Sequence, residues 1–230
     1  MPPLRAPAGR TVAVLPVKRF SAAKQRLDGD LSDGTRRALA EAMVTDVLIA
    51  LRRAKRVDEV LVVSGEHTAV ALAAGYDAAA VIDDPDDAGH SSAAVRGIAA
   101  ALERGAKRVL LVPGDCPALD PLELDDLLSR PIAGPEVLVV PDRHGSGTNA
   151  LVLTPPDVLR PAFGPGSRER HEQRAREAGV AVECVSVSTL GLDVDTLNDL
   201  EALRAALEDV RGGASHTRGL LARVGRVGGR

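Results

Sequence analysis

Carboxylates follow apolar segments at two places in this chain of 230 residues. The stretch "VLLVPGDC" (109–116) runs from four apolar residues through a Pro-Gly turn to Asp115, and "GLDVDT" (191–196) contains Asp193 and Asp195. An isolated charge is costly to bury, so a carboxylate at the end of a buried strand must be paired, hydrogen-bonded or bound to a cation. Mg²⁺ is commonly held by one or two carboxylates together with substrate phosphates. These three residues are therefore candidate metal ligands.

Each carboxylate also has a structural explanation. Asp115 could cap a short helix that we expect to begin near Pro121, and Thr196 or Asp195 could cap the helix that follows them. In an extended segment Asp193 and Asp195 point to the same side. We favour Asp193 as the second metal ligand, with Asp195 as a cap or an outer partner.

Basic residues gather in "LPVKRFSAAKQRL" (15–27). Lys18 and Lys24 are two of only four lysines among the 29 basic residues of the chain. A lysine ammonium suits a phosphate as a point charge, and Arg19 and Arg26 would add forked donors. Neither a GxxxxGK[ST] nor a GxGxxG motif occurs in the sequence, so a P-loop and a Rossmann fingerprint are both excluded. An ordinary basic surface loop is the alternative.

Glycines, Thr148 and Ser167 characterise two further segments, "DRHGSGTNAL" (142–151) and "FGPGS" (163–167). Glycine lets backbone amides approach an anion closely, and a helix that begins at Ser167 would favour negative charge at its N-terminus. The two segments together predict a pocket for a small phosphorylated acid, with two flexible surface loops as the alternative.

Histidine and cysteine show no catalytic or metal-binding spacing. We expect His90 and His144 to be bystanders and Cys116 to be a small packing residue. Cys116 and Cys184 form no CxxC pair, which disfavours a disulfide framework or a zinc site and fits a reducing cytoplasm.

Apolar runs alternate with helical patterns along most of the chain. The alternation implies βαβ units and a single α/β domain with a mostly parallel sheet, in which ligands bind beyond the carboxyl ends of the strands. Strands are expected at 11–17, 59–64, 79–82, 108–113, 136–141, 149–154 and 181–187. Helices are expected at 32–54 with Ser32 or Asp33 as N-cap, 66–74, 91–105 with Ser91 and Gly105 as caps, 121–129, 167–179 and 196–210.

The domain is expected to span residues 11–210, between an N-terminal stub (1–10) and a basic tail (211–230). The tail holds five arginines and no acidic residue, which predicts disorder, with a contact to a partner or nucleic acid as the alternative. No apolar run approaches the ~18 residues of a membrane span. With 1% aromatic residues, stacking on single-stranded nucleic acid is also disfavoured.

Six motifs together carry a resemblance to a known family. They are "LPVKRFSAAKQRL", "GHSSAAVRGI", "VPGDCPAL", "HGSGTNAL", "FGPGS" and "DVDTLNDL". In this order they resemble the 2-phospho-L-lactate or phosphoenolpyruvate guanylyltransferases of coenzyme F-420 biosynthesis, over residues 11–207.

The resemblance implies a three-layer α/β/α nucleotidyltransferase fold. It implies transfer of GMP from GTP to the phosphate of phosphoenolpyruvate or 2-phospho-L-lactate, with Mg²⁺ as cofactor and pyrophosphate as the second product. It also implies a hand-over of the unstable product to the next enzyme of the pathway, and it leaves the oligomeric state open.

The resemblance also assigns residues by motif. Asp115 and Lys24 would be catalytic, and Asp115 would hold the metal together with Asp193 or Asp195. The remaining assignments are Thr148, Gly164 and Ser167 for the acid, and Pro16, Lys24, Arg26, Ser91 and Asp115 for the nucleotide. One departure is that "LPVKRFSAAKQRL" lacks the Gly-rich loop that often follows the first strand in this fold.

Three other functions compete. A nucleotidyltransferase could act on molybdopterin or a sugar phosphate, and a non-catalytic sensor would bind GTP without releasing pyrophosphate. A glycosyltransferase could use "DVD" as its metal motif, although here the triad follows the last strand rather than one in the middle of the chain.

Overall fold

The computed structural model describes residues 9–22, 24–27, 31–76, 79–83, 89–209 and 212–227. Seven strands form one sheet in the order β3-β2-β1-β4-β6-β5-β7. Only β6 runs antiparallel to its neighbours, so the sheet is mostly parallel, as predicted. The strands are β1 (Thr11–Pro16), β2 (Glu59–Ser64), β3 (Ala79–Asp83), β4 (Arg108–Leu111), β5 (Glu136–Pro141), β6 (Thr148–Thr154) and β7 (Ala181–Cys184).

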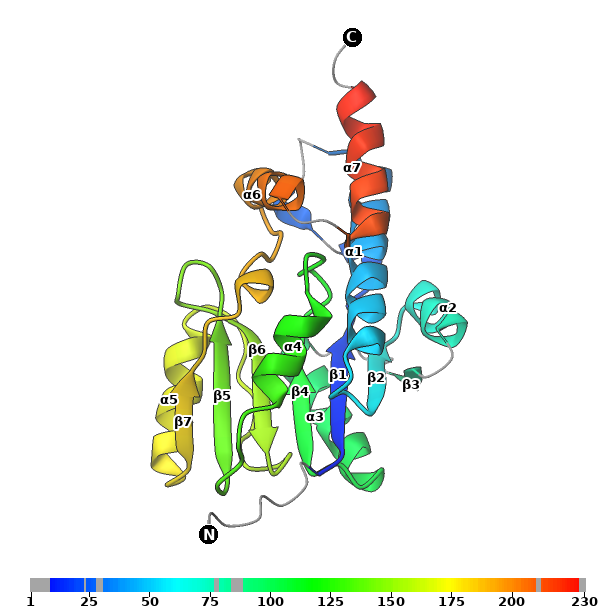
Figure 1. Cartoon of the computed structure of the whole chain (residues 1–230). Helices are drawn as coiled ribbons and strands as arrows, with labels where there is room; N and C mark the ends of the chain where they lie inside the picture. The colour runs from blue at the N-terminus through cyan, green and yellow to red at the C-terminus, as the bar shows by residue number, and fades with distance from the viewer. Residues whose placement is uncertain are drawn as a thin grey trace.

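Helices cover both faces of this sheet (Figure 1). The α-helices are α1 (Asp33–Arg53), α2 (His67–Gly75), α3 (His90–Glu103), α4 (Pro121–Leu128), α5 (Ser167–Glu177), α6 (Leu197–Asp209) and α7 (Ser215–Val227). Short 3₁₀ helices occur at Phe20–Ala22, Gln25–Leu27 and Ser188–Leu190.

The alternation of side chains along β1 produces the layers. Ala13 and Leu15 pack with α1, α2 and α4 in one apolar core, whereas Val12 and Val14 pack with α3 and α5 in a second core on the opposite face. Because successive strand residues point to opposite faces, a continuous apolar run fits a strand that is covered on both sides. The predicted three-layer α/β/α architecture is therefore confirmed (Figure 1).

The C-terminal segment corrects one prediction. Residues 215–227 form helix α7, which lies along α1 (Figure 1), instead of the disordered tail that the composition suggested. Thr217 is fully buried and Leu221 is 8% exposed, and Leu221 packs with Leu39 and Met43 of α1 in a third apolar cluster. The few apolar residues of the tail lie on one face of a helix, which a count of arginines and glycines does not reveal.

The start of α3 corrects a second prediction, that Ser91 caps this helix. Gly89 is its N-cap and the helix begins at His90, so Ser91 lies inside the first turn and is not the expected cap. Ser32 does cap α1, by accepting a hydrogen bond from the Thr35 amide at 3.3 Å.

The strand predicted at 181–187 is also shorter than expected, since β7 ends at Cys184. Val185 still donates to the carbonyl of Val139 at 2.9 Å, after which the chain leaves the sheet edge. Among the residues that the structure describes, no helix is both long and apolar enough to cross a membrane.

Candidate functional site

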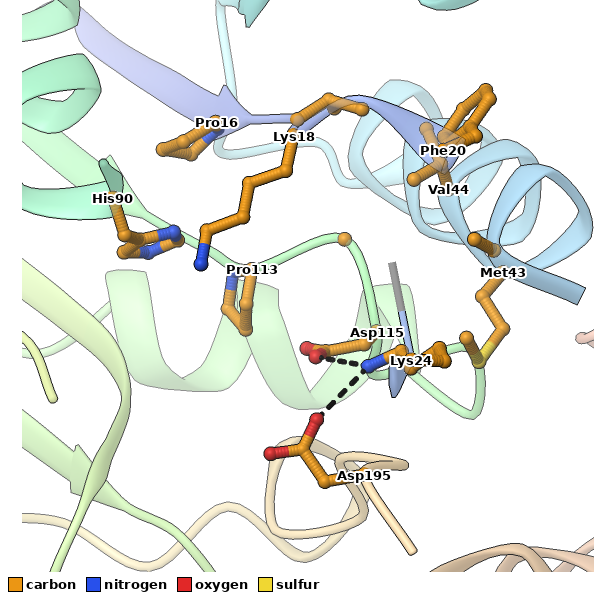
Figure 2. Close-up of a pocket in the computed structure, with 13 residues that line it drawn as sticks. Pro16, Lys18, Phe20, Lys24, Met43, Val44, His90, Pro113, Asp115 and Asp195 are labelled. Carbon is orange, nitrogen blue, oxygen red and sulfur yellow. Dashed lines mark hydrogen bonds and ion pairs between the residues drawn. The ribbon is translucent and has the colours of Figure 1, made fainter. Parts of the chain in front are cut away.

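A cavity of about 260 Å³ lies at the carboxyl ends of β1 and β4 (Figure 2). These neighbouring parallel strands mark the point where the strand order reverses, because the chain runs from β1 outward to β2 and β3 and then returns to β4 on the other side. Ligands bind at such switch points in open α/β sheets. The lining residues are Pro16, Val17, Lys18, Phe20, Lys24, Ala40, Met43, Val44, His90, Pro113, Gly114, Asp115 and Asp195.

The turn after β4 brings Asp115 into this cavity. A Cβ atom on Gly114 would lie 2.7 Å from Cγ2 of Val44, so only glycine allows the turn to pack this closely against α1. The N-cap of α4 is Asp120, whose carboxylate accepts from the Leu122 amide at 2.8 Å. Asp115 therefore does not cap that helix, and its carboxylate faces the cavity.

Lys24 joins the two acidic segments. Its ammonium lies 2.7 Å from Oδ2 of Asp115 and 3.2 Å from Oδ1 of Asp195 (Figure 2). Burial disfavours the charged form of Lys24, but the two carboxylates outweigh it and raise the pKa of the ammonium. Burial would likewise raise the pKa of Asp115, yet the charge and hydrogen bond of Lys24 lower it. Lys24 and Asp115 are therefore both charged at neutral pH.

The backbone conformation of Lys24 is unusual for a residue with a side chain, with φ at 57° in the left-handed region. Such conformations cost energy and cluster at functional sites. The two ion pairs of the side chain help to hold the residue in this conformation.

Hydrogen bonds to the turn after β4 and to β6 hold the segment that carries Asp195 in place. The Val194 amide donates to the Asp115 carbonyl at 3.2 Å. The carbonyl of Leu190 accepts from Nδ2 of Asn149 at 2.6 Å and from Sγ of Cys116 at 3.5 Å. The buried Asn149 of β6, which the sequence analysis does not single out, thus holds the last acidic segment against β6.

Asp193 and Asp195 have different partners, which bears on the choice between them. Oδ1 of Asp193 accepts from Nδ2 of Asn149 at 3.0 Å, and burial raises the pKa of Asp193, with a further contribution from Asp115. The cap of α6 is Thr196, whose hydroxyl accepts from the Asp199 amide at 3.3 Å, so Asp195 does not cap that helix. The geometry therefore favours Asp195 over our earlier choice, Asp193, as the partner of Asp115.

The residues at this site fit a divalent cation bound jointly with a substrate. Within the described part of the chain, no group of three or more His, Cys, Asp or Glu side chains could hold a metal ion by itself. Asp115 and Asp195 nevertheless converge on one positive charge. Two carboxylates completed by phosphate oxygens are a typical Mg²⁺ site.

His90 and Lys18 both line the same cavity, and the Lys18 side chain extends toward the His90 ring (Figure 2). Burial lowers the pKa of His90 to about 4, against the opposing charge of Asp115, so the ring is neutral near pH 7. His90, which we expect to be a bystander, is the first residue of α3 and lines the cavity. Pro16, Lys24 and Asp115 line the cavity as expected, while the side chain of Arg26 lies outside the described part of the structure.

The three residues expected to bind the acid lie apart from this cavity, around the start of α5. Oγ1 of Thr148 is 3.0 Å from Nδ1 of His171, and the Ser167 amide donates to the Gly164 carbonyl at 3.0 Å. Ser167 is only 1% exposed. The two Gly-rich segments do meet, because the Arg168 amide donates to the Ser146 carbonyl at 3.3 Å.

A second cavity, of about 360 Å³, lies where these segments meet. Two of its lining side chains are carboxylates, which do not suit an anionic ligand. Its lining residues are Gly145, Ser146, Gly166, Arg168, Glu169 and Glu172.

Ser91 links the two regions. Its hydroxyl accepts from the Phe163 amide at 2.9 Å, and the Phe163 ring lies edge-on to His90 with 4.6 Å between centroids. Ser91 therefore connects the start of α3, beside the first cavity, with the loop that contains Gly164.

Comparison with known proteins agrees with the family resemblance that the six sequence motifs carry. Residues 11–225 match the family described as guanylyl transferase CofC like. The chain is 55% identical over 212 residues to a phosphoenolpyruvate guanylyltransferase of Conexibacter woesei, covering 92% of this chain and 95% of the relative. It is 40% identical over 195 residues to a protein of the same name from Sphaerobacter thermophilus, with coverages of 84% and 92%.

Solved structures of nucleotidyltransferases share the fold. A candidate nucleotide-diphospho-sugar transferase of Desulfovibrio desulfuricans G20 superposes with a TM-score of 0.73 at 17% identity, covering 93% of this chain and 94% of that one. A CMP-2-keto-3-deoxy-manno-octonic acid synthetase in complex with CTP gives a TM-score of 0.57 at 19% identity, with coverages of 87% and 99%. Together with the family match, these relatives show that the chain belongs to the CofC-like family of guanylyl transferases.

Proposed function

We propose that this protein transfers the GMP unit of GTP to the phosphate of phosphoenolpyruvate and releases pyrophosphate. The choice of acid rests on the relatives of that name. The structural observation that carries the proposal is the meeting of Asp115 and Asp195 at one ammonium, at the switch point of the sheet.

In the reaction, an oxygen of the acceptor phosphate forms a bond to the α-phosphorus of GTP. The bond from that phosphorus to the bridging oxygen of the β-phosphate breaks, and pyrophosphate leaves with the electron pair. The acceptor is an anion at neutral pH, so no general base is needed. The neutral ring of His90, whose pKa burial lowers to about 4, is suited to packing and hydrogen bonding at the cavity.

The main barrier is the repulsion between two anionic substrates. Lys18 and Lys24 place positive charge at the cavity, where it reduces this repulsion and stabilises the developing charge. Asp115 and Asp195 would hold Mg²⁺, which, when bound, neutralises phosphate charge as a Lewis acid. The pair of lysines also accounts for a phosphate site without a Gly-rich loop.

The acid would bind near Thr148, Gly164 and Ser167, which lie apart from the lining of this cavity but are linked to it. Two links support this placement. Asn149, next to Thr148, binds Asp193 at 3.0 Å, and Phe163, next to Gly164, binds Ser91 at 2.9 Å.

The test is pyrophosphate release from GTP and Mg²⁺ with phosphoenolpyruvate, 2-phospho-L-lactate or a hexose 1-phosphate as acceptor. We expect release with phosphoenolpyruvate, and little with the sugar phosphate. Release with the sugar phosphate alone would contradict the proposed acceptor class. Tight GTP binding without release for any acceptor would indicate a nucleotide sensor instead.

A further inference from the structure

His171 is a buried polar residue that the reaction described above does not use. Its side chain is fully buried on α5 and makes two hydrogen bonds. Nδ1 lies 3.0 Å from Oγ1 of Thr148, and Nε2 accepts from the Ala162 amide at 2.9 Å. The ring therefore joins the first residue of β6 to the loop before α5.

These contacts determine which ring nitrogen carries the proton. A backbone amide can only donate, so Nε2 must offer its lone pair to Ala162. Burial, together with the nearby charges of Arg170 and Arg174, lowers the pKa of His171 to about 4, so the ring is neutral near pH 7. The single ring proton is then on Nδ1, which donates to Oγ1 of Thr148.

The direction of the hydrogen bond between His171 and Thr148 determines what the Thr148 hydroxyl can do with its own proton. When Oγ1 of Thr148 accepts from His171, the hydroxyl proton of Thr148 is left to donate elsewhere. Thr148 is only partly buried, unlike His171, so part of this residue is open to solvent. An anionic ligand can only accept hydrogen bonds, and a hydroxyl fixed as a donor is complementary to it.

The same ring also helps to hold the loop that contains Gly164. His171 binds the amide of Ala162, while Nη2 of Arg170 donates to the carbonyls of Ala162 and Phe163 at 3.1 and 3.4 Å. These carbonyl oxygens, which would repel an anion, are thereby engaged by a cation on α5. The Phe163 ring lies edge-on to His171 with 5.3 Å between centroids.

We propose that His171 is a positioning residue for the acid substrate, which makes the Thr148 hydroxyl a fixed hydrogen-bond donor and anchors the neighbouring loop. This inference rests on the proposed function, because it takes Thr148 as a contact of the acid. A histidine with a merely structural role would instead affect folding, or both substrates alike.

Two substitutions separate the two hydrogen bonds of the ring. In His171→Asn the amide nitrogen can occupy the place of Nδ1 and still donate to Thr148. In His171→Gln the longer side chain can reach the place of Nε2 and accept from Ala162, but the donor to Thr148 is lost. The two variants are otherwise similar in polarity, so each is the control for the other.

The experiment measures KM for phosphoenolpyruvate and for GTP in both variants, in Thr148→Val and in the double variant His171→Gln/Thr148→Val. Loss of a hydrogen bond to a charged group predicts a rise in KM for phosphoenolpyruvate of about tenfold to a hundredfold in His171→Gln. His171→Asn should stay nearer to the wild type, and KM for GTP should change little in either. The double variant should be no worse than Thr148→Val alone, since both changes remove the same donor.

Equal increases in both KM values, equal effects of Asn and Gln, or additive effects in the double variant would overturn the proposal. Nitrogen-15 NMR of the ring adds a test that needs no substrate, and a proton on Nε2 would also overturn it. If the wild type uses a different phosphorylated acid, the comparison is made with that acid. If it uses none, the proposed function fails, while the ring tautomer still decides the role of His171.

Discussion

At Lys24, one ammonium lies between two carboxylates that would otherwise repel each other. Asp115 and Asp195 reach it from separate segments, at 2.7 and 3.2 Å. The side chain of Lys24 is largely buried, so removal of a carboxylate would leave its charge less compensated and lower the local stability. Function and local stability therefore depend on the same three side chains, and a test of the site must keep the shape of the residue that it changes.

The conservative change Asp115→Asn tests the role of this carboxylate. We expect kcat/KM to fall by about a hundredfold or more, as for the loss of one electrostatic contact to a transition state, with the protein still folded by circular dichroism. Asp120→Asn is the matched control, since Asp120 caps α4 and asparagine is an equally good cap. Activity of Asp115→Asn close to that of the wild type would refute the assignment.

A magnesium titration distinguishes Asp195 from Asp193. Asp195 and Asp115 both pair with the ammonium of Lys24, whereas Asp193 accepts a hydrogen bond from the side-chain amide of Asn149. Asp195→Asn should therefore raise the Mg²⁺ concentration for half-maximal pyrophosphate release more than Asp193→Asn does. The reverse order would restore Asp193 as the second ligand.

The buried His171 predicts a loss of stability in mild acid. Burial lowers its pKa in the folded protein to about 4, below the value of roughly 6.5 in the unfolded chain. Between these values the unfolded state binds the proton preferentially, so stability is present above pH 6.5 and decreases toward pH 4. From pH 7 to pH 5 this group should lower the free energy of unfolding by about 2 kcal/mol.

Urea denaturation at the two pH values checks this expectation. His171→Asn should show a smaller decrease than the wild type, whereas the exposed residue His67, changed to asparagine, should leave the decrease intact. An unchanged decrease in His171→Asn would show that other groups cause it.

At the scale of elements, the close approach of α3 to the sheet places the start of that helix beside the cavity. A Cβ atom on Gly97 would lie 2.2 Å from Cγ1 of Val14 on β1 and 3.2 Å from Cγ2 of Val63 on β2. Glycine lowers helix propensity by about 1 kcal/mol relative to alanine. Gly97 therefore lowers the helix propensity of α3 but lets this helix lie close to β1 and β2. This close packing places His90 and Ser91, at the start of the helix, beside the cavity.

Gly97→Ala should therefore destabilise the protein despite the gain in helix propensity. Overpacking in a core costs about 1–3 kcal/mol, which exceeds that gain, and urea denaturation measures the net effect. Gly34→Ala on α1 is the control, because nothing lies within 4 Å of the added atom. It should be neutral or stabilising, and the same outcome for Gly97→Ala would contradict the packing argument.

At the scale of the whole molecule, the C-terminal helix completes the core at the end of α1. Asp46 of α1, only 3% exposed, accepts from the amides of His216 and Thr217 at 3.1 and 2.8 Å. A residue of the first quarter of the chain thus caps helix α7. This long-range cap joins α7 to the domain that we had expected to end at residue 210.

Asp46→Ala removes the cap and leaves the amides of His216 and Thr217, the second of them buried, without their acceptor. We expect a decrease of about 2 kcal/mol in the free energy of unfolding. Asp33→Ala, which removes an exposed carboxylate from the same helix, should change it by less than about 0.5 kcal/mol. Similar effects of the two changes would show that the Asp46 contact contributes no more than a surface charge.

The sequence alone determined the fold class, most of the elements and the residues around which the site is built. Strands β1, β5 and β6 and helices α5 and α6 lie within one or two residues of the predicted bounds, because burial on one or both faces imposes a period that is visible in the sequence. The position of Asp115 after an apolar strand was informative for the same reason, since a charge there needs a partner.

Only the tertiary structure decided which distant groups meet. It shows that β6 runs antiparallel to its neighbours, that Ser91 contacts Phe163 and that Asp195 pairs with Lys24. It also shows the contacts of α7 with Asp46 and of Thr148 with His171. Each of these depends on a contact between segments far apart in the chain. Local periodicity records whether a side chain is buried, but the identity of its neighbour is settled only when the elements pack together.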